Sequence, residues 1–177
     1  MFPSSSKENR SRKPLSASGV EVAAYFLDSS ALVKRYVQEV GTSWVRDITR
    51  RETDAYIYVA SITAVEVTSA IARRRHGKTL STARASAILS RFRTHLAGRY
   101  NILEITPNLM DDAMTLADTH ELRACDAVQL AVALGLRKDW EDAGFGRVVF
   151  VSSDQDLNVA AIAEGLGVKD PRLDPSG

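Results

Sequence analysis

The chain is organised around residues 25–37, which read YFLDSSALVKRYV. An apolar run ends abruptly in Asp28 and two serines, and apolar residues then recur four positions apart. This change of pattern predicts a buried strand, a tight turn and a helix. An acidic residue at the carboxyl end of a strand stands where an open α/β sheet places its ligand site. Taken alone, Asp28 is more simply explained as a helix cap, so the case for chemistry rests on the other motifs.

Composition sets the limits of the interpretation. The 177 residues fit one domain, and the single cysteine, which cannot form an internal disulfide, fits a reducing, cytoplasmic setting. Cys125 lies in an apolar segment, so we expect a small core residue. A net charge of +1 argues against binding nucleic acid by bulk charge alone, although local basic patches stay open. No apolar run approaches the ~18 residues of a membrane span, so no membrane association is expected.

The expected domain covers residues 23–170. Residues 1–22 are rich in Ser, Lys and Arg and lack the apolar centre of a secretion signal, which predicts a disordered N-terminal tail. Its basic residues could contact nucleic acid, but a role in solubility is the simpler explanation. Residues 171–177 are expected to form a proline-containing C-terminal tail.

Strands and helices alternate along the predicted domain. We expect strands at 25–27, 55–60, 100–105 and 147–151, and a short edge strand within 165–168. Helices are expected at 44–51, 63–75, 81–97, 108–119, 124–136 and 155–164, with a loop at 139–146. The two helices at 63–75 and 81–97 form a helical hairpin. This alternation is typical of a parallel sheet with helices on both faces.

Four carboxylates share one position, at the carboxyl end of a strand or the amino end of a helix: Asp28, Glu66, Asp126 and Asp154. In a parallel sheet these ends lie on one edge of the molecule. Capping and the helix dipole explain any single one, and Thr63 to Glu66 has the spacing of a capping box. The set is harder to explain in that way. Asp126 enters a largely buried segment, and a buried charge must be paired or hold a metal.

Converging carboxylates call for a cation. Two unit charges ~4 Å apart repel by ~1 kcal/mol in water and by ~4 kcal/mol at an effective dielectric of about 20. Hard oxygen ligands select Mg²⁺ or Mn²⁺ rather than zinc, and the three histidines lack the spacing of zinc ligands. The sequence also has no nucleophile elbow, no phosphate-binding lysine loop and no glycine-rich dinucleotide motif after a strand.

Together these motifs resemble the PIN-domain family, and within it the VapC-type toxin ribonucleases of type II toxin–antitoxin systems. The resemblance covers about residues 25–168 and rests on four pieces: LDSSALVK at 27–34, the helix with Glu66, LRACDAVQLA at 122–131, and VSSD at 151–154. It implies a three-layer α/β/α fold with a parallel five-stranded sheet in the order 3-2-1-4-5. That order would bring Asp28 and Asp154 together at the switch point.

The resemblance also implies a function, that of a metal-dependent endoribonuclease, the toxin component of a toxin–antitoxin pair. A water activated by Mg²⁺ or Mn²⁺ would hydrolyse RNA and leave a 5′-phosphate and a 3′-hydroxyl. The catalytic and metal-binding residues would be Asp28, Glu66, Asp126 and Asp154, with one or two metals. Two departures stand out, because Gln129 occupies a position that often holds histidine and Asp156 competes with Asp154 for the fourth role. A homodimer and a small antitoxin protein that covers the acidic groove are implied as partners.

Substrate contacts are expected from Ser30 and Ser152, which match the hydroxyl positions of the family, and from Arg123 beside the acidic site. Basic residues also cluster at 73–78 and on the next helix, and we call them the second basic cluster. They fit a helix face exposed to solvent about as well as a surface that binds RNA. Two other functions stay open, a catalytically silent PIN-like module that binds RNA or protein, and a related DNA or flap nuclease.

Overall fold

The computed structural model describes residues 24–50, 53 and 55–173. The predicted N-terminal tail at 1–22 lies outside the described residues, as do residues 174–177 of the predicted C-terminal tail at 171–177. Within that part of the chain, five parallel strands form one sheet in the order β3-β2-β1-β4-β5. The strands are β1 (Ala24–Leu27), β2 (Tyr56–Ala60), β3 (Asn101–Leu103), β4 (Val148–Val151) and β5 (Gly167–Lys169). The predicted strand order is therefore confirmed.

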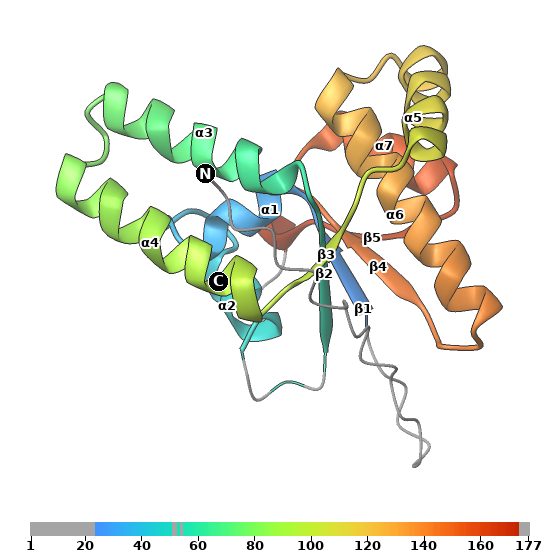
Figure 1. The fold of residues 1–177 in the computed structure, drawn as a ribbon, viewed down its shortest axis with the longest axis horizontal. Helices are drawn as coiled ribbons and strands as arrows, with labels where there is room; N and C mark the ends of the chain where they lie inside the picture. The colour runs from blue at the N-terminus through green and yellow to red at the C-terminus, as the bar shows by residue number, and fades with distance from the viewer. Residues whose placement is uncertain (1–23, 51–52, 54, 174–177) are drawn as a thin grey trace.

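Helices cover both faces of this sheet (Figure 1). One face carries α1 (Ser29–Leu32), the 3-10 helix η1 (Val33–Arg35), α2 (Thr42–Ile48), α3 (Thr63–His76) and α4 (Thr82–Gly98). The other carries α5 (Pro107–His120), α6 (Ala124–Asp142) and α7 (Gln155–Ala163). The last described turn is η2 (Pro171–Leu173). Each described helix is too short or too polar to cross a lipid bilayer.

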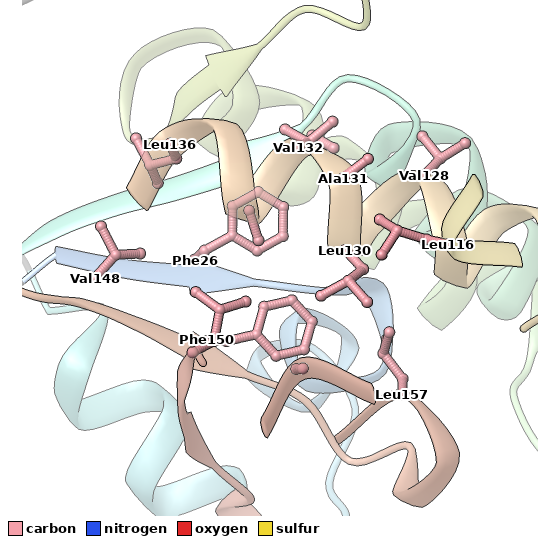
Figure 2. Packing of buried hydrophobic residues seen from close by; sticks show 14 of the residues in the cluster. Phe26, Leu116, Val128, Leu130, Ala131, Val132, Leu136, Val148, Phe150 and Leu157 are labelled. Atoms are coloured by element: carbon pink, nitrogen blue, oxygen red, sulfur yellow. The ribbon is translucent and has the colours of Figure 1, made fainter. Parts of the chain in front are cut away.

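Alternation along the strands separates the two hydrophobic cores. Phe26 on β1 and Phe150 on β4 stack on one face with ring centroids 5.7 Å apart and pack against α6 and α7 (Figure 2). Leu27 and Val151 point to the opposite face, where they join residues of α1, α3 and α4. Because successive side chains of a strand alternate between faces, both faces of these strands are apolar and covered.

The structure extends one helix beyond its predicted end. The sequence favours a loop from residue 139, whereas α6 runs on to Asp142. Trp140 is the reason, because it lies one turn beyond Leu136 on the buried face and only 4% of it is exposed. Its ring meets Tyr56, Tyr58 and Phe145 edge-on. Burial of a large aromatic side chain thus outweighs the polar residues around it.

Candidate functional site

Asp28 stands at the end of β1 and is almost fully buried, with 2% of it exposed. Its Oδ1 accepts hydrogen bonds from the Ala31 amide and the Ser30 hydroxyl, both at 2.9 Å, so Asp28 does cap α1. The cap does not explain its surroundings. Burial raises the pKa of Asp28 to about 7, against the hydrogen bonds that lower it and with a further rise from the charge of Glu66. The charged form of Asp28 would therefore need a positive charge nearby to offset its burial and the charge of Glu66.

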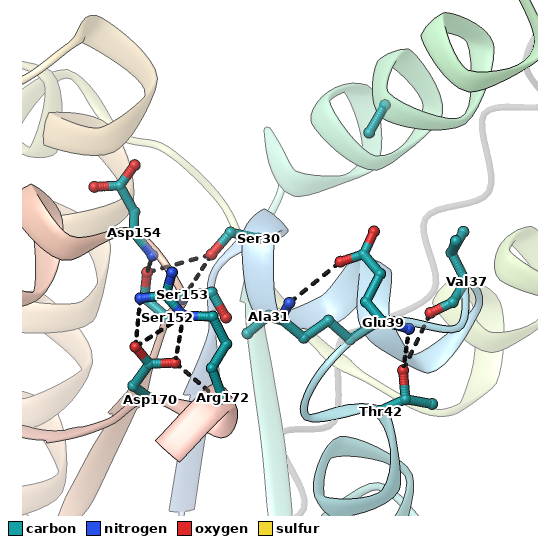
Figure 3. A network of polar contacts seen from close by, with 12 residues as sticks. Ser30, Ala31, Val37, Glu39, Thr42, Ser152, Ser153, Asp154, Asp170 and Arg172 are labelled. Atoms are coloured by element: carbon teal, nitrogen blue, oxygen red, sulfur yellow. Dashed lines mark hydrogen bonds and ion pairs between the residues drawn. The ribbon is translucent and has the colours of Figure 1, made fainter. Parts of the chain in front are cut away.

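The Ser30 hydroxyl joins the end of β1 to the end of β4 through contacts with the Ser153 amide and the Ser152 hydroxyl (Figure 3). The Ser30 hydroxyl accepts a hydrogen bond from the Ser153 amide at 2.8 Å and lies 3.4 Å from the Ser152 hydroxyl. The Ser152 hydroxyl in turn accepts from the Asp154 amide at 3.0 Å. The two serines named by the sequence therefore lie together, and Ser152 is fully buried.

Glu66 lies in the first turn of α3 and is held by a residue from the opposite layer. The Gln129 amide on α6 donates to Glu66 Oε2 at 2.6 Å and to the Thr63 hydroxyl at 2.8 Å. The expected capping box is wrong, because Ile62 is the N-cap of α3 and makes no side-chain cap. Thr63 and Glu66 are instead acceptors for a buried amide, which fixes the direction of the Glu66 carboxylate.

Asp126 lies in the first turn of α6 but does not cap it, because Arg123 is the N-cap residue and no side-chain hydrogen bond closes that end. Burial, together with the charges of Asp154 and Glu66, raises the pKa of Asp126 to about 6. The neighbouring Arg123 guanidinium lowers it. These mutual effects place Asp126 within electrostatic reach of two other carboxylates from the predicted set.

Two acidic residues compete for the fourth position. Asp154 caps α7 by accepting from the Leu157 amide at 3.1 Å, and Asp156 lies in the first turn of the same helix. Both raise the pKa of Asp126, and Asp154 has the larger effect. Of the two, Asp154 therefore has the stronger electrostatic coupling to Asp126.

The four carboxylates influence one another electrostatically, but the described residues do not form a metal centre. Within residues 24–50, 53 and 55–173, no three His, Cys, Asp or Glu side chains are placed to hold one metal ion together. The chemistry of the donors does fit a hard divalent cation, since the set offers only oxygens. Burial raises the pKa values of Asp28 and Asp126, and a bound cation would favour their charged forms.

A pocket of about 610 Å³ opens beside these residues, with Ser30, Glu66 and Ser153 in its lining. Cys125 also lines it and is exposed, so the expected core role for this residue is wrong. It lies on the outward side of the first turn of α6, whereas the apolar residues that suggested burial begin at Ala127.

Two basic residues in this pocket were not singled out from the sequence. Lys34 is buried and pairs with Glu39, Nζ to Oε2 at 3.2 Å. Arg172 is placed by an ion pair with Asp170 in which their closest atoms are 2.6 Å apart (Figure 3). Lys34 is the last residue of the LDSSALVK motif at 27–34, so the sequence could have pointed to it. Arg172 follows a proline in the expected tail, where nothing in the sequence marks it.

Only part of the second basic cluster, at 73–78, lines the pocket beside the carboxylates. Arg73 and Arg74 line the pocket, and Arg74 forms an ion pair with Glu39. Arg123 is exposed at the start of α6, near Asp126 but outside the pocket lining. The structure therefore offers several cations around the carboxylates rather than the single one that the sequence favoured.

The molecule is an α/β protein with a five-stranded parallel sheet whose central carboxyl edge carries buried and half-buried carboxylates. The sequence profile of the PIN domain matches residues 25–163. The chain belongs to the PIN domain family. No curated protein sequence matches the chain.

Solved structures with the same fold include three bacterial proteins. A toxin–antitoxin complex from Klebsiella pneumoniae aligns with a TM-score of 0.55 at 18% identity, covering 83% of this chain and 97% of that one. VapC20 of Mycobacterium tuberculosis aligns with a TM-score of 0.56 at 15% identity, over 85% and 99%. FitAcB from Neisseria gonorrhoeae gives 0.55 at 17% identity, over 85% and 99%. At such identities the likeness establishes the fold.

Proposed function

We propose that this protein is a metal-dependent endoribonuclease and the toxin of a toxin–antitoxin pair. The observation that supports the proposal is the electrostatic coupling of Asp28 to Glu66, and of Asp126 to Glu66 and Asp154. Burial and mutual repulsion raise the pKa of Asp28 and Asp126. Membership of the PIN domain family supports nuclease chemistry.

The four carboxylates would hold one or two Mg²⁺ or Mn²⁺ ions, directly or through water. The bound metal would lower the pKa of a water and offset charge on the phosphate. In this mechanism no side-chain nucleophile is required.

The protein's own residues would position these groups. Gln129 fixes the Glu66 carboxylate, and the hydroxyls of Ser30 and Ser152 tie the end of β1 to that of β4. Arg123 and Arg172 would contact a phosphate of the substrate, because guanidinium groups bind phosphate oxygens in pairs of hydrogen bonds.

Similar structures support the choice of substrate and partner. VapC20 is described as a toxin that cleaves the sarcin-ricin loop, an RNA element. The structure from Klebsiella pneumoniae is a toxin–antitoxin complex. By likeness of fold, we propose an RNA substrate, an inhibitory antitoxin and a homodimer for this chain, and a cytoplasmic location.

Incubation of the purified protein with total RNA and Mn²⁺, followed by sequencing of the cut ends, tests the proposal. We expect discrete cuts that leave a 5′-phosphate, and none in Asp126→Asn. A protein that binds RNA without cutting it would be the silent module. Cleavage competed by DNA flaps but not by RNA would assign the chain to DNA instead.

A further inference from the structure

A second pocket, of about 320 Å³, lies between η1, α2 and α4, and the carboxylates do not line it. Its lining residues are Arg35, Tyr36, Arg46, Arg50, Arg91 and His95. We propose that this pocket binds a backbone phosphate of the RNA strand, away from the bond that is cut. The inference rests on the proposed function, which it extends from the cleavage site to the path of the substrate.

The charge of the pocket is unbalanced. Four guanidinium groups line it, and among the described residues one of them, that of Arg50, forms an ion pair with a carboxylate, that of Asp47. The chain as a whole carries a net charge of only +1, so this local excess does not follow from a basic composition. Guanidinium groups held together repel one another, and a bound anion offsets that repulsion.

Part of the cluster has a structural role. Arg35 Nη1 donates to the Thr49 carbonyl oxygen at 2.9 Å, and Arg99 Nη2 donates to the same oxygen at 2.6 Å. Thr49 closes the carboxyl end of α2, where the helix dipole attracts cations. Arg35 therefore stabilises the end of α2, and its buried Nε has no hydrogen-bond partner among the described residues.

Arg46 and Arg91 are the members that a ligand would use. Both are exposed, and their interactions leave the charge uncancelled. Arg46 Nε makes a long hydrogen bond of 3.4 Å to the Arg35 carbonyl oxygen, and the Arg91 guanidinium lies 5.9 Å from the centre of the Tyr36 ring. Neither interaction uses the full set of guanidinium donors, so both side chains can still bind a phosphate.

The pocket also lies within reach of the cleavage site. Helix α1 begins next to Asp28 and continues directly into η1, which ends at Arg35. At about 1.5–2.0 Å per residue, the chain advances on the order of 10 Å from Ser29 to Arg35. That distance is spanned by a few nucleotides, so one strand can occupy the cleavage site and this pocket together.

The test compares two double variants of equal charge. Arg46→Gln with Arg91→Gln removes the two exposed pocket cations, whereas Arg84→Gln with Arg93→Gln removes two exposed arginines of α4 that do not line the pocket. Binding of a labelled single-stranded RNA is measured by fluorescence anisotropy in EDTA, at several salt concentrations. Melting temperatures confirm that both variants fold. A third variant, Arg46→Lys with Arg91→Lys, keeps the charge and loses the guanidinium fork.

We expect the pocket variant to bind RNA about tenfold more weakly, with the slope of log K against log salt reduced by about 0.7, since one phosphate contact on a single strand contributes roughly 0.7. The α4 control should bind like the wild type, and the lysine variant should keep the salt slope while losing part of the affinity. Equal weakening in the pocket and control variants would overturn the proposal. So would stabilisation by inorganic phosphate with unchanged RNA binding, or stronger competition by an acidic peptide than by unlabelled RNA.

A failure of the pocket is distinguishable from a failure of the proposed function. If the wild type cuts RNA with Mn²⁺ and the pocket variant binds RNA normally, only the pocket assignment fails. If Asp126→Asn cuts RNA as well as the wild type does, the cleavage site fails, whatever the pocket variant shows.

Discussion

Asp126 and Glu66 separate a structural role from a chemical one, because neither is a helix cap in the structure. We predict that Asp126→Asn and Glu66→Gln reduce RNA cleavage by orders of magnitude. Their melting temperatures without metal should hold or rise, because repulsion among the carboxylates is relieved. Melting curves and cleavage assays with Mn²⁺ on the same variants check both effects. Unchanged cleavage in Asp126→Asn would remove the catalytic assignment, and Asp156→Asn is the matched control on a neighbouring acid.

The gain in stability should depend on pH. The pKa of Asp126 rises from 3.8 to about 6 on folding, so the folded state binds the extra proton between these values and metal-free stability falls as pH rises through them. Asp126→Asn removes this loss. Its melting temperature should therefore exceed that of the wild type by more at pH ~8 than at pH ~4. Equal differences at both pH values would contradict the electrostatic explanation.

Asp28 caps α1 and is also a proposed metal ligand. Replacing its carboxylate with an amide distinguishes these two roles. In Asp28→Asn the side-chain oxygen can still accept from the Ala31 amide, so α1 keeps its cap. The lost charge should abolish Mn²⁺ binding in titration calorimetry. Equal binding by the variant and the wild type would show that the metal, if bound, is held elsewhere.

At the scale of elements, η2 packs on the turn before α2. Gly41 has a φ of 89°, and a Cβ there would lie 2.5 Å from the Pro171 carbonyl oxygen. We predict that Gly41→Ala destabilises the protein by ~1–3 kcal/mol more than Gly144→Ala, which has the same strain at a φ of 70° but nothing within 4 Å. Urea unfolding measures the difference. Deleting residues 171–177 should abolish it, and a difference that survives the deletion would exclude the clash with η2.

The carboxyl end of α6 gives a second test. Trp140→Ala should cost ~3–5 kcal/mol, whereas the exposed neighbour Asp139→Ala should change stability by less than ~0.5 kcal/mol. Similar small losses for the two variants would mean that the helix ends near Leu136, as the sequence favours.

At the scale of the whole molecule, assembly is the main expectation. We predict a homodimer in light scattering and inhibition of cleavage by a small protein encoded beside this chain. An acidic site is blocked by an inserted Arg or Lys, so the inhibitor should present one. A monomer at high concentration would contradict the dimer, and a neighbouring gene product that neither binds nor inhibits would contradict the antitoxin.

The fold was largely predictable because its determinants are local. Apolar runs gave the strands to within a few residues, Ser81 and Pro107 marked helix starts, and alternation indicated a parallel sheet. The resemblance supplied the strand order. The extension of α6 to Asp142 was not predicted, because the residues next to Trp140 are polar. Trp140 is buried only because Tyr56 and Tyr58 pack against it.

The sequence alone indicated which residues stand at the strand ends and helix starts, and hence which four carboxylates are candidates for a site. It could not determine what those carboxylates touch. Gln129 meets Glu66 across 63 positions, and Ser30 meets Ser153 across 123, because the sheet brings distant segments together. Arg172 and the arginine pocket likewise take their positions from the packing of segments that are distant in sequence. Periodicity and caps act within a few residues, whereas charges gather wherever packing places them, and only the tertiary structure decides that.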